Sequence, residues 1–255
     1  MIFHTIGEKS KSAVLLIHGM LTPRQIWDTA AEHFSKEHYV IVPELDAHTL
    51  DEPSTFTSVE NEAEKIRQYL METTGGKLFL LAGLSMGGRI AAELAAMPGI
   101  ETSYLILDGA PLSSMSGLLK GIMKANYKSI IRSSKKRDPK VLASAKKEFL
   151  PERFIPDYLK VADHMEETSI DNMIDSVFAP YTFRKYSDRT KILFMHGTKG
   201  NEAVAKKAAL KLKKINPQTK INCYQGYAHA QLACFEPEKW VEEIDKWIKA
   251  EKKGQ

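Results

Sequence analysis

Cysteine is scarce in this chain of 255 residues, which contains only Cys223 and Cys234. Two thiols cannot build the disulfide framework that stabilises small secreted domains, and no group of histidines and cysteines has the spacing of a zinc site. We therefore expect no bound metal, and reduced thiols in a cytoplasmic protein. The residues that follow Met1 also lack the basic and apolar segments of a secretory signal.

Long apolar runs are absent as well. The longest strictly apolar runs, such as residues 13–17 and 78–82, have about five residues, whereas a membrane-spanning helix needs roughly 20. Hydrophobic residues make up 43% of the chain and charged residues 27%, which is typical of a globular protein. This composition excludes a disordered chain, a collagen and a coiled-coil rod.

Positive charge is concentrated in one segment. Residues 117–160 contain 12 Lys and Arg against 4 Asp and Glu, a net charge of +8, whereas the whole chain carries only +4. Such a segment usually forms a solvated face, and otherwise attracts anionic substrates or an acidic membrane surface. No nucleic-acid motif or aromatic-interleaved basic stripe accompanies the charge, so we expect no nucleic-acid partner.

Short apolar runs alternate with longer stretches of helical spacing. The runs lack polar alternation, as expected for strands that are buried on both faces of a parallel sheet. The predicted strands are residues 13–17, 39–42, 78–82, 104–107, 192–195 and 221–224, and the predicted helices are residues 23–36, 58–73, 86–97 and an amphipathic segment after Pro237. This order predicts an α/β fold with a mostly parallel central sheet flanked by helices.

The alternation stops after Pro111 and resumes at about Tyr186. The intervening stretch has no convincing strand and shows helical segments separated by prolines. We therefore predict an α/β core formed by residues 1–111 and 187–255, with a helical cap inserted over residues 112–186. The methionine and aromatic side chains of this cap either form a small core of their own or line an acyl pocket.

The strongest local motif is Gly-Leu-Ser-Met-Gly-Gly at residues 83–88, which fits G-x-S-x-G between a predicted strand and a predicted helix. At the apex of such a turn a serine projects its hydroxyl out of the sheet, and the glycines remove Cβ atoms that would collide. The amides of the following helix favour negative charge there. Because the spacings of the phosphate-binding loops are absent, we predict that Ser85 is a nucleophile rather than part of a structural turn.

On these residues the sequence resembles the α/β-hydrolase superfamily over nearly its whole length, and the Gly-x-Ser-Met-Gly-Gly form is similar to that of small bacterial carboxylesterases and lipases. The resemblance implies a serine hydrolase that cleaves small-molecule carboxylic esters through an acyl-enzyme and needs no cofactor. Thioesterases, carbon–carbon bond hydrolases and lyases on the same scaffold are alternatives, as is a binding protein without turnover. The sequence does not indicate an oligomeric state.

Two backbone amides are expected to bind the oxyanion that forms during acyl transfer. One is the N–H of Met86, directly after the nucleophile. The loop after residues 13–17 reads His18-Gly19-Met20, which resembles the superfamily's His-Gly motif and implies the N–H of Met20 as the second donor. We expect the side chain of His18 to hold its own loop by hydrogen bonds and not to take part in catalysis.

The superfamily carries its triad in the order Ser, acid, His, which implies His229, after the last predicted strand, as the base. The acid departs from the usual pattern, because the position that normally holds aspartate is Gly200. Asp108 ends the strand after the nucleophile helix, where some members carry their acid, and Glu202 lies two residues beyond Gly200. Both also have ordinary interpretations, in a turn and at a helix start. The sequence therefore leaves the acid open, with Asp108 placed before Glu202.

Overall fold

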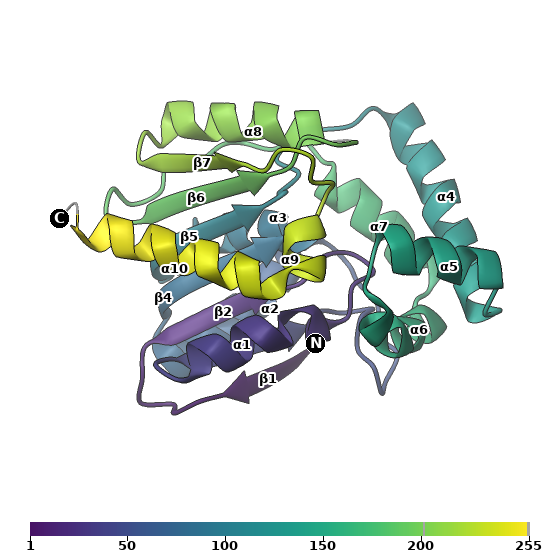
Figure 1. Ribbon diagram of the computed structural model, residues 1–255, viewed down its shortest axis with the longest axis horizontal. Coiled ribbons are helices and arrows are strands. Elements are labelled where there is room, and N and C mark those ends of the chain that lie inside the picture. The colour runs from purple at the N-terminus through teal and green to yellow at the C-terminus, as the bar shows by residue number, and fades with distance from the viewer. Residues whose placement is uncertain (201, 254–255) are drawn as a thin grey trace.

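A seven-stranded sheet forms the centre of the protein in the computed structural model, which describes residues 1–200 and 202–253 (Figure 1). The strand order is β1-β3-β2-β4-β5-β6-β7; β1 is antiparallel to β3, and all the other pairs are parallel. The strands are β1 Ile2–Ile6, β2 Ala13–Ile17, β3 Tyr39–Glu44, β4 Lys77–Leu84, β5 Glu101–Asp108, β6 Lys191–His196 and β7 Thr219–Cys223. The predicted mostly parallel sheet is confirmed.

The parallel strands are the ones that the apolar runs predicted. Every residue of β2 and β3 is buried, as expected where helices cover both faces of a sheet. The antiparallel edge strand β1 was missed, because its residues are exposed or half-buried and form no apolar run. An edge strand needs little apolar surface on its free side.

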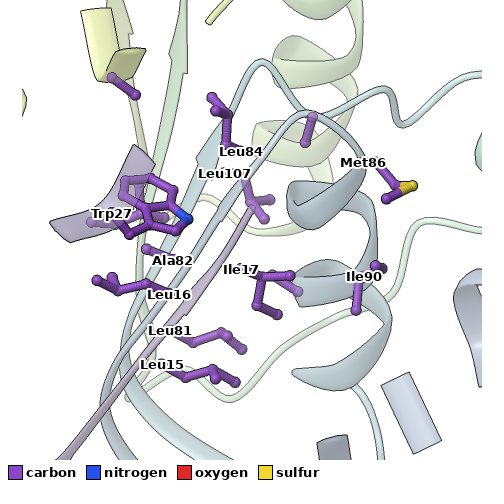
Figure 2. Close-up of a cluster of buried hydrophobic side chains, with 14 of the residues drawn as sticks. Leu15, Leu16, Ile17, Trp27, Leu81, Ala82, Leu84, Met86, Ile90 and Leu107 are labelled. Carbon is purple, nitrogen blue, oxygen red and sulfur yellow. The ribbon is translucent and has the colours of Figure 1, made fainter. Parts of the chain in front are cut away.

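Helices cover both faces of the sheet, with α1 and α10 on one face and α2 and α3 on the other (Figure 1). Leu16 and Ala82 point toward Trp27 on the first face, whereas Ile17 and Leu81 point toward α3 (Figure 2). The helices of the core are α1 Asp28–Ser35 after the 3-10 turn η1 Arg24–Trp27, α2 Val59–Thr74, α3 Met86–Leu94, α8 Glu202–Ile215, α9 Gln231–Phe235 and α10 Pro237–Lys253.

Four helices are inserted between β5 and β6, and the described residues between Pro111 and Tyr186 contain no strand. These inserted helices lie to one side of the sheet (Figure 1). They are α4 Gly117–Lys135, α5 Pro139–Glu148, α6 Ile155–His164, preceded by the 3-10 turn η2 Glu152–Phe154, and α7 Glu167–Val177. Pro139 is the first residue of α5 and Pro156 the second residue of α6, in the first turn of a helix, where a missing N–H costs nothing.

Helix α7 holds the insertion against the segment that leads into α2. The Oγ atoms of Ser169 and Ser176 accept hydrogen bonds from the amides of Phe56 (3.1 Å) and Val59 (2.6 Å), and the side chain of Asn172 donates to the carbonyl of Phe56 (2.9 Å). Polar side chains of α7 therefore provide hydrogen-bond partners for backbone groups of a loop that is not part of the sheet.

Ion pairs neutralise much of the basic segment. Cations of α4 and of the turn after it pair with acidic residues of α6 and α7, which lie just beyond the basic stretch in sequence. The pairs are Lys124–Asp175 (2.6 Å), Lys128–Asp171 (2.7 Å), Arg132–Glu167 (2.5 Å) and Arg137–Asp163 (2.6 Å). Exposed pairs of this kind contribute about 0–1 kcal/mol each, so they set charge balance more than stability.

The packing of the sheet predicts the effect of truncating one strand residue. Leu81 is fully buried between the helical layers, so Leu81→Ala should lower the free energy of unfolding by about 3 kcal/mol through lost burial and a residual cavity. Leu118, on α4, is 77% exposed, so Leu118→Ala should change it by less than about 0.5 kcal/mol. Urea unfolding measures both, and equal losses would contradict this description of the core.

Candidate active site

The predicted nucleophile occupies a strained turn between β4 and α3. Ser85 has φ 53° and ψ −117°, a conformation that non-glycine residues rarely adopt. A Cβ atom at Gly83 would lie 2.2 Å from the carbonyl oxygen of Gly87, and one at Gly87 would lie 2.3 Å from that of Ile17. These two positions therefore require glycine, because the start of α3 is pressed against its own strand and against the end of β2.

His229 brings its ring to this serine from the loop after β7. Its Nε2 atom lies 2.8 Å from the Oγ atom of Ser85, although 144 residues separate the two in sequence. The ring packs over Gly109, where a Cβ atom would lie 2.7 Å from its Cε1 atom. Gly109, which the sequence analysis did not single out, has φ 60° and leaves the space that the ring occupies.

Glu202 lies on the other side of the ring. Its Oε1 atom is 2.7 Å from the Nδ1 atom of His229, and its Oε2 atom accepts a hydrogen bond from the amide of Gly197 at 2.7 Å. The carboxylate is 2% exposed. Burial favours a higher pKa for Glu202, but the hydrogen bond and charge of His229 and the Gly197 amide outweigh it, so the pKa lies below its usual range. Glu202 is therefore ionised at neutral pH.

Asp108, which the sequence analysis placed first as the acid, makes a different contact. Its Oδ2 atom accepts a hydrogen bond from Nε1 of Trp240 at 2.9 Å, and no hydrogen bond joins it to His229 among the described residues. Burial raises the pKa of this carboxyl to about 7, although the Trp240 hydrogen bond and His229 oppose the rise. The expectation that favoured Asp108 is therefore corrected: β5 ends with this carboxyl turned toward α10, and Glu202 takes the place beside the imidazole.

The loop after β2 lies against the serine. A Cβ atom at Gly19 would lie 3.4 Å from the Cβ atom of Ser85, so the next amide, that of Met20, belongs to the same small region. Met20 N–H has no hydrogen-bond acceptor within residues 1–200 and 202–253. Met86 is the first residue of α3, where the N–H has no partner within the helix. Both amides are therefore available to an external oxygen.

The other histidines near this edge of the sheet are engaged elsewhere. His18 is buried and bonds through Nδ1 to the carbonyl of Gly19 at 2.9 Å, in keeping with the expected loop-holding role. His196 is also buried, and its Nδ1 atom lies 2.7 Å from the carbonyl of Gly197. Neither histidine makes a hydrogen bond to Ser85 in the described part of the chain.

Two further properties of the described residues bear on ligands and membranes. No group of three or more His, Cys, Asp or Glu side chains within residues 1–200 and 202–253 could hold a metal ion. Over the same residues, no helix combines the length and the apolar character that a bilayer crossing requires.

Known proteins share this fold. A family model described as the alpha/beta hydrolase fold matches residues 12–126, somewhat under half of the chain. A solved α/β hydrolase family protein from Desulfitobacterium hafniense is 21% identical, with a TM-score of 0.77 over 97% of this chain and 100% of that one. A thermophilic esterase from Thermogutta terrifontis is 20% identical, with a TM-score of 0.71 over 98% and 93% of the two chains. The chain has the α/β-hydrolase fold, as the sequence predicted.

One curated relative matches part of the chain. A Haemophilus influenzae protein named as a 2-succinyl-6-hydroxy-2,4-cyclohexadiene-1-carboxylate synthase is 28% identical over 102 residues, which are 39% of this chain and 41% of that protein. The match thus spans less than half of that relative. At these identities the solved structures show the fold and do not identify a substrate.

The raised pKa of Asp108 predicts a pH-dependent stability difference. A carboxyl whose pKa rises on folding, here from 3.8 to about 7, stabilises the folded state at low pH and loses that contribution as the pH rises through 7. Asparagine keeps an acceptor for Trp240 but cannot ionise. We expect Asp108→Asn to exceed the wild type in unfolding free energy at pH 8, by up to about 4 kcal/mol at 1.36 kcal/mol per pKa unit.

The difference in unfolding free energy between Asp108→Asn and the wild type should become smaller as the pH falls toward 4. Urea unfolding of both proteins between pH 5 and pH 8, with Asp51→Asn as a control at an exposed carboxylate, measures the effect. A stability difference between Asp108→Asn and the wild type that stays constant over this range would contradict the account.

Proposed function

We propose that this protein is a serine hydrolase that cleaves small-molecule carboxylic esters. The observation that carries the proposal is the unbroken chain of contacts from Glu202 through His229 to Ser85, at 2.7 Å and 2.8 Å. A nucleophile, a base and a group that orients the base, each within hydrogen-bond distance of the next, form the arrangement that nucleophilic acyl transfer needs.

In this mechanism Ser85 Oγ attacks the ester carbonyl while His229 Nε2 takes the hydroxyl proton. A carboxylate can only accept hydrogen bonds, so the contact with Glu202 keeps the hydrogen of His229 on Nδ1 and leaves Nε2 as the acceptor. Glu202 then stabilises the imidazolium. The imidazolium returns its proton to the leaving alcohol, and water, activated by the same imidazole, releases the acid from the acyl-enzyme.

The amides of Met20 and Met86 are proposed to hold the negative oxygen of the tetrahedral intermediate. Their support is that neither amide is used by another group in the described chain and that both adjoin Ser85. Donors that are fixed before the reaction stabilise developing charge without reorganisation. No metal or organic cofactor enters this scheme.

The inserted helices α4 to α7 are proposed to act as the cap that the sequence predicted over residues 112–186, on a core of residues 1–111 and 187–255. Support comes from the neck of the insertion, where the amide of Met115 donates to the carbonyl of Phe178 at 3.2 Å. This bond ties the two connecting segments together, so the insertion leaves and rejoins the core at one place. A cytoplasmic location is proposed on the two free thiols, Cys223 and Cys234.

A second candidate is a lyase or carbon–carbon bond reaction on the same scaffold. Its support is the partial match to the Haemophilus influenzae synthase. The same imidazole would serve as a base in either reaction, and the fold alone does not choose between them. Assay of the reaction that gives that synthase its name, run beside the ester and thioester panel below, separates the candidates.

Labelling tests the nucleophile. A fluorophosphonate probe should react covalently with the wild-type protein at Ser85, and Ser85→Ala should abolish the label, because the probe needs an activated serine. Mass spectrometry of the labelled peptide gives the site. Nitrophenyl esters from acetyl to palmitoyl, with thioesters beside them, then measure acyl preference. A protein that takes no label and turns over none of these substrates would end the hydrolase proposal and favour a binding protein.

The two carboxylates give a matched pair of variants. Glu202→Gln should lower kcat by at least about 10²-fold, because the amide no longer stabilises the imidazolium or fixes its tautomer. Asp108→Asn should leave kcat within about fivefold of the wild type, since Asp108 contacts Trp240 and not the imidazole. Steady-state kinetics on the best ester measures kcat for both variants. A larger decrease in kcat for Asp108→Asn than for Glu202→Gln would contradict the assignment of Glu202 as the acid.

A further inference from the structure

Two buried histidines join the loop after β2 to the loop after β3 by reciprocal hydrogen bonds. The Nε2 atom of His18, in the first loop, accepts the amide N–H of Leu45 in the second at 3.2 Å. The Nε2 atom of His48, in the second loop, accepts the amide N–H of Leu21 in the first at 2.9 Å. Each loop thus supplies one imidazole and one amide to the other.

The remaining ring nitrogens fix the tautomers. His18 Nδ1 donates to the carbonyl of Gly19 at 2.9 Å, and His48 Nδ1 donates to the carbonyl of Asp46 at 3.0 Å. All four contacts are satisfied only when both rings are neutral with hydrogen on Nδ1. Both rings are fully buried, and burial lowers the pKa of His18 to about 3 and of His48 to about 4. Both therefore remain acceptors at neutral pH.

These contacts surround one peptide unit. In a trans peptide the C=O and the N–H point in opposite directions, so whatever holds the carbonyl of Gly19 also aims the N–H of Met20. That carbonyl accepts hydrogen bonds from the ring of His18 and from the hydroxyl of Thr22, both at 2.9 Å. The amide of the next peptide, at Leu21, is held by His48.

The loop does not adopt this shape without restraint. Leu21 has φ 61°, a left-handed conformation that costs a residue with a branched side chain roughly 1–2 kcal/mol. A leucine remains there only when surrounding contacts over-determine it. Two hydrogen bonds do so: the amide of Leu21 donates to His48 at 2.9 Å, and the amide of Thr22 donates to the carbonyl of Gly19 at 3.4 Å and closes the turn around Leu21.

We propose that His48 and Thr22 are positioning residues of the oxyanion hole: together with His18 they orient the Gly19–Met20 peptide so that the Met20 amide points at the oxygen above Ser85. This inference rests on the proposed hydrolase function and deepens it. It assigns a role in transition-state stabilisation to two side chains that do not contact the reacting atoms.

Substitutions at residue 48 separate positioning from packing. Glutamine places its Oε1 atom near the position of the imidazole Nε2 and can accept from Leu21, so His48→Gln should keep kcat within about fivefold. Leucine has similar bulk but no acceptor, so His48→Leu should lower kcat by about 10–10²-fold. This decrease is no larger than the one caused by removing an oxyanion donor altogether. KM should change by less than about threefold, because the ground-state ester needs the hole less than the transition state does.

A trifluoromethyl ketone, which forms an anionic adduct with an active serine, provides the readout that a merely structural role would not move. The affinity of the ketone for folded His48→Leu should fall by the same factor as kcat, and the affinity for His48→Gln should be close to that of the wild type. His33→Leu, on α1 and remote from these loops, is the control and should match the wild type. Equal losses in the leucine and glutamine variants, or wild-type kcat and ketone affinity in His48→Leu, overturn the inference.

Thr22 supplies the second arm of the test, which also decides the outcome if His48→Leu fails to fold. Thr22→Val removes the hydroxyl that holds the Gly19 carbonyl and should lower kcat by about tenfold, whereas Thr22→Ser should restore it. Unchanged kcat in Thr22→Val overturns the role of this residue. A wild-type protein that takes no label and turns over no ester would refute the proposed hydrolase function. An active wild-type protein whose variants at residues 22 and 48 all remain fully active would refute only the positioning roles of Thr22 and His48.

Discussion

The parallel alignment of β2 and β4 to β7 is the constraint on which the candidate site depends. Parallel strands end at the same edge of a sheet, so the loops after them meet although they are distant in sequence. Ser85 follows β4, Glu202 follows β6 and His229 follows β7, and their side chains form one hydrogen-bonded chain. The buried sheet thereby fixes the distances between these three side chains, which flexible loops alone would not fix.

Close approach of backbone segments is the second requirement, and glycine meets it at a few positions. Gly87 lets the start of α3 touch the end of β2, and Gly109 leaves room for the ring of His229. Gly197 packs under the His229 loop, where a Cβ atom would lie 2.1 Å from the carbonyl of Tyr227, and its amide binds Glu202. The same small residues that allow tight packing therefore also position the side chains of His229 and Glu202.

The fold was predictable from the sequence, and the site only in part, for identifiable physical reasons. Apolar runs of buried parallel strands and the turn at Ser85 are local signals, and the α/β-hydrolase fold predicted from them is confirmed. The acid was not predictable, because Glu202 both starts α8 and turns its carboxylate to His229, so the helix start and the contact with the imidazole fall on the same residue. His48 was missed because a single side chain that bonds a distant amide leaves no periodic pattern.

The two buried carboxyl groups at this edge of the sheet, Glu202 and Asp108, have pKa values that their surroundings shift in opposite directions. Glu202 accepts a hydrogen bond from the imidazole of His229 at one oxygen and from the amide of Gly197 at the other, which lowers its pKa and keeps its charge. The buried carboxyl of Asp108 accepts a hydrogen bond from a single indole N–H, so burial prevails and its pKa rises to about 7. A base needs an ionised partner to stabilise its cation. Of the two, Glu202 therefore fits that role both by position and by charge state.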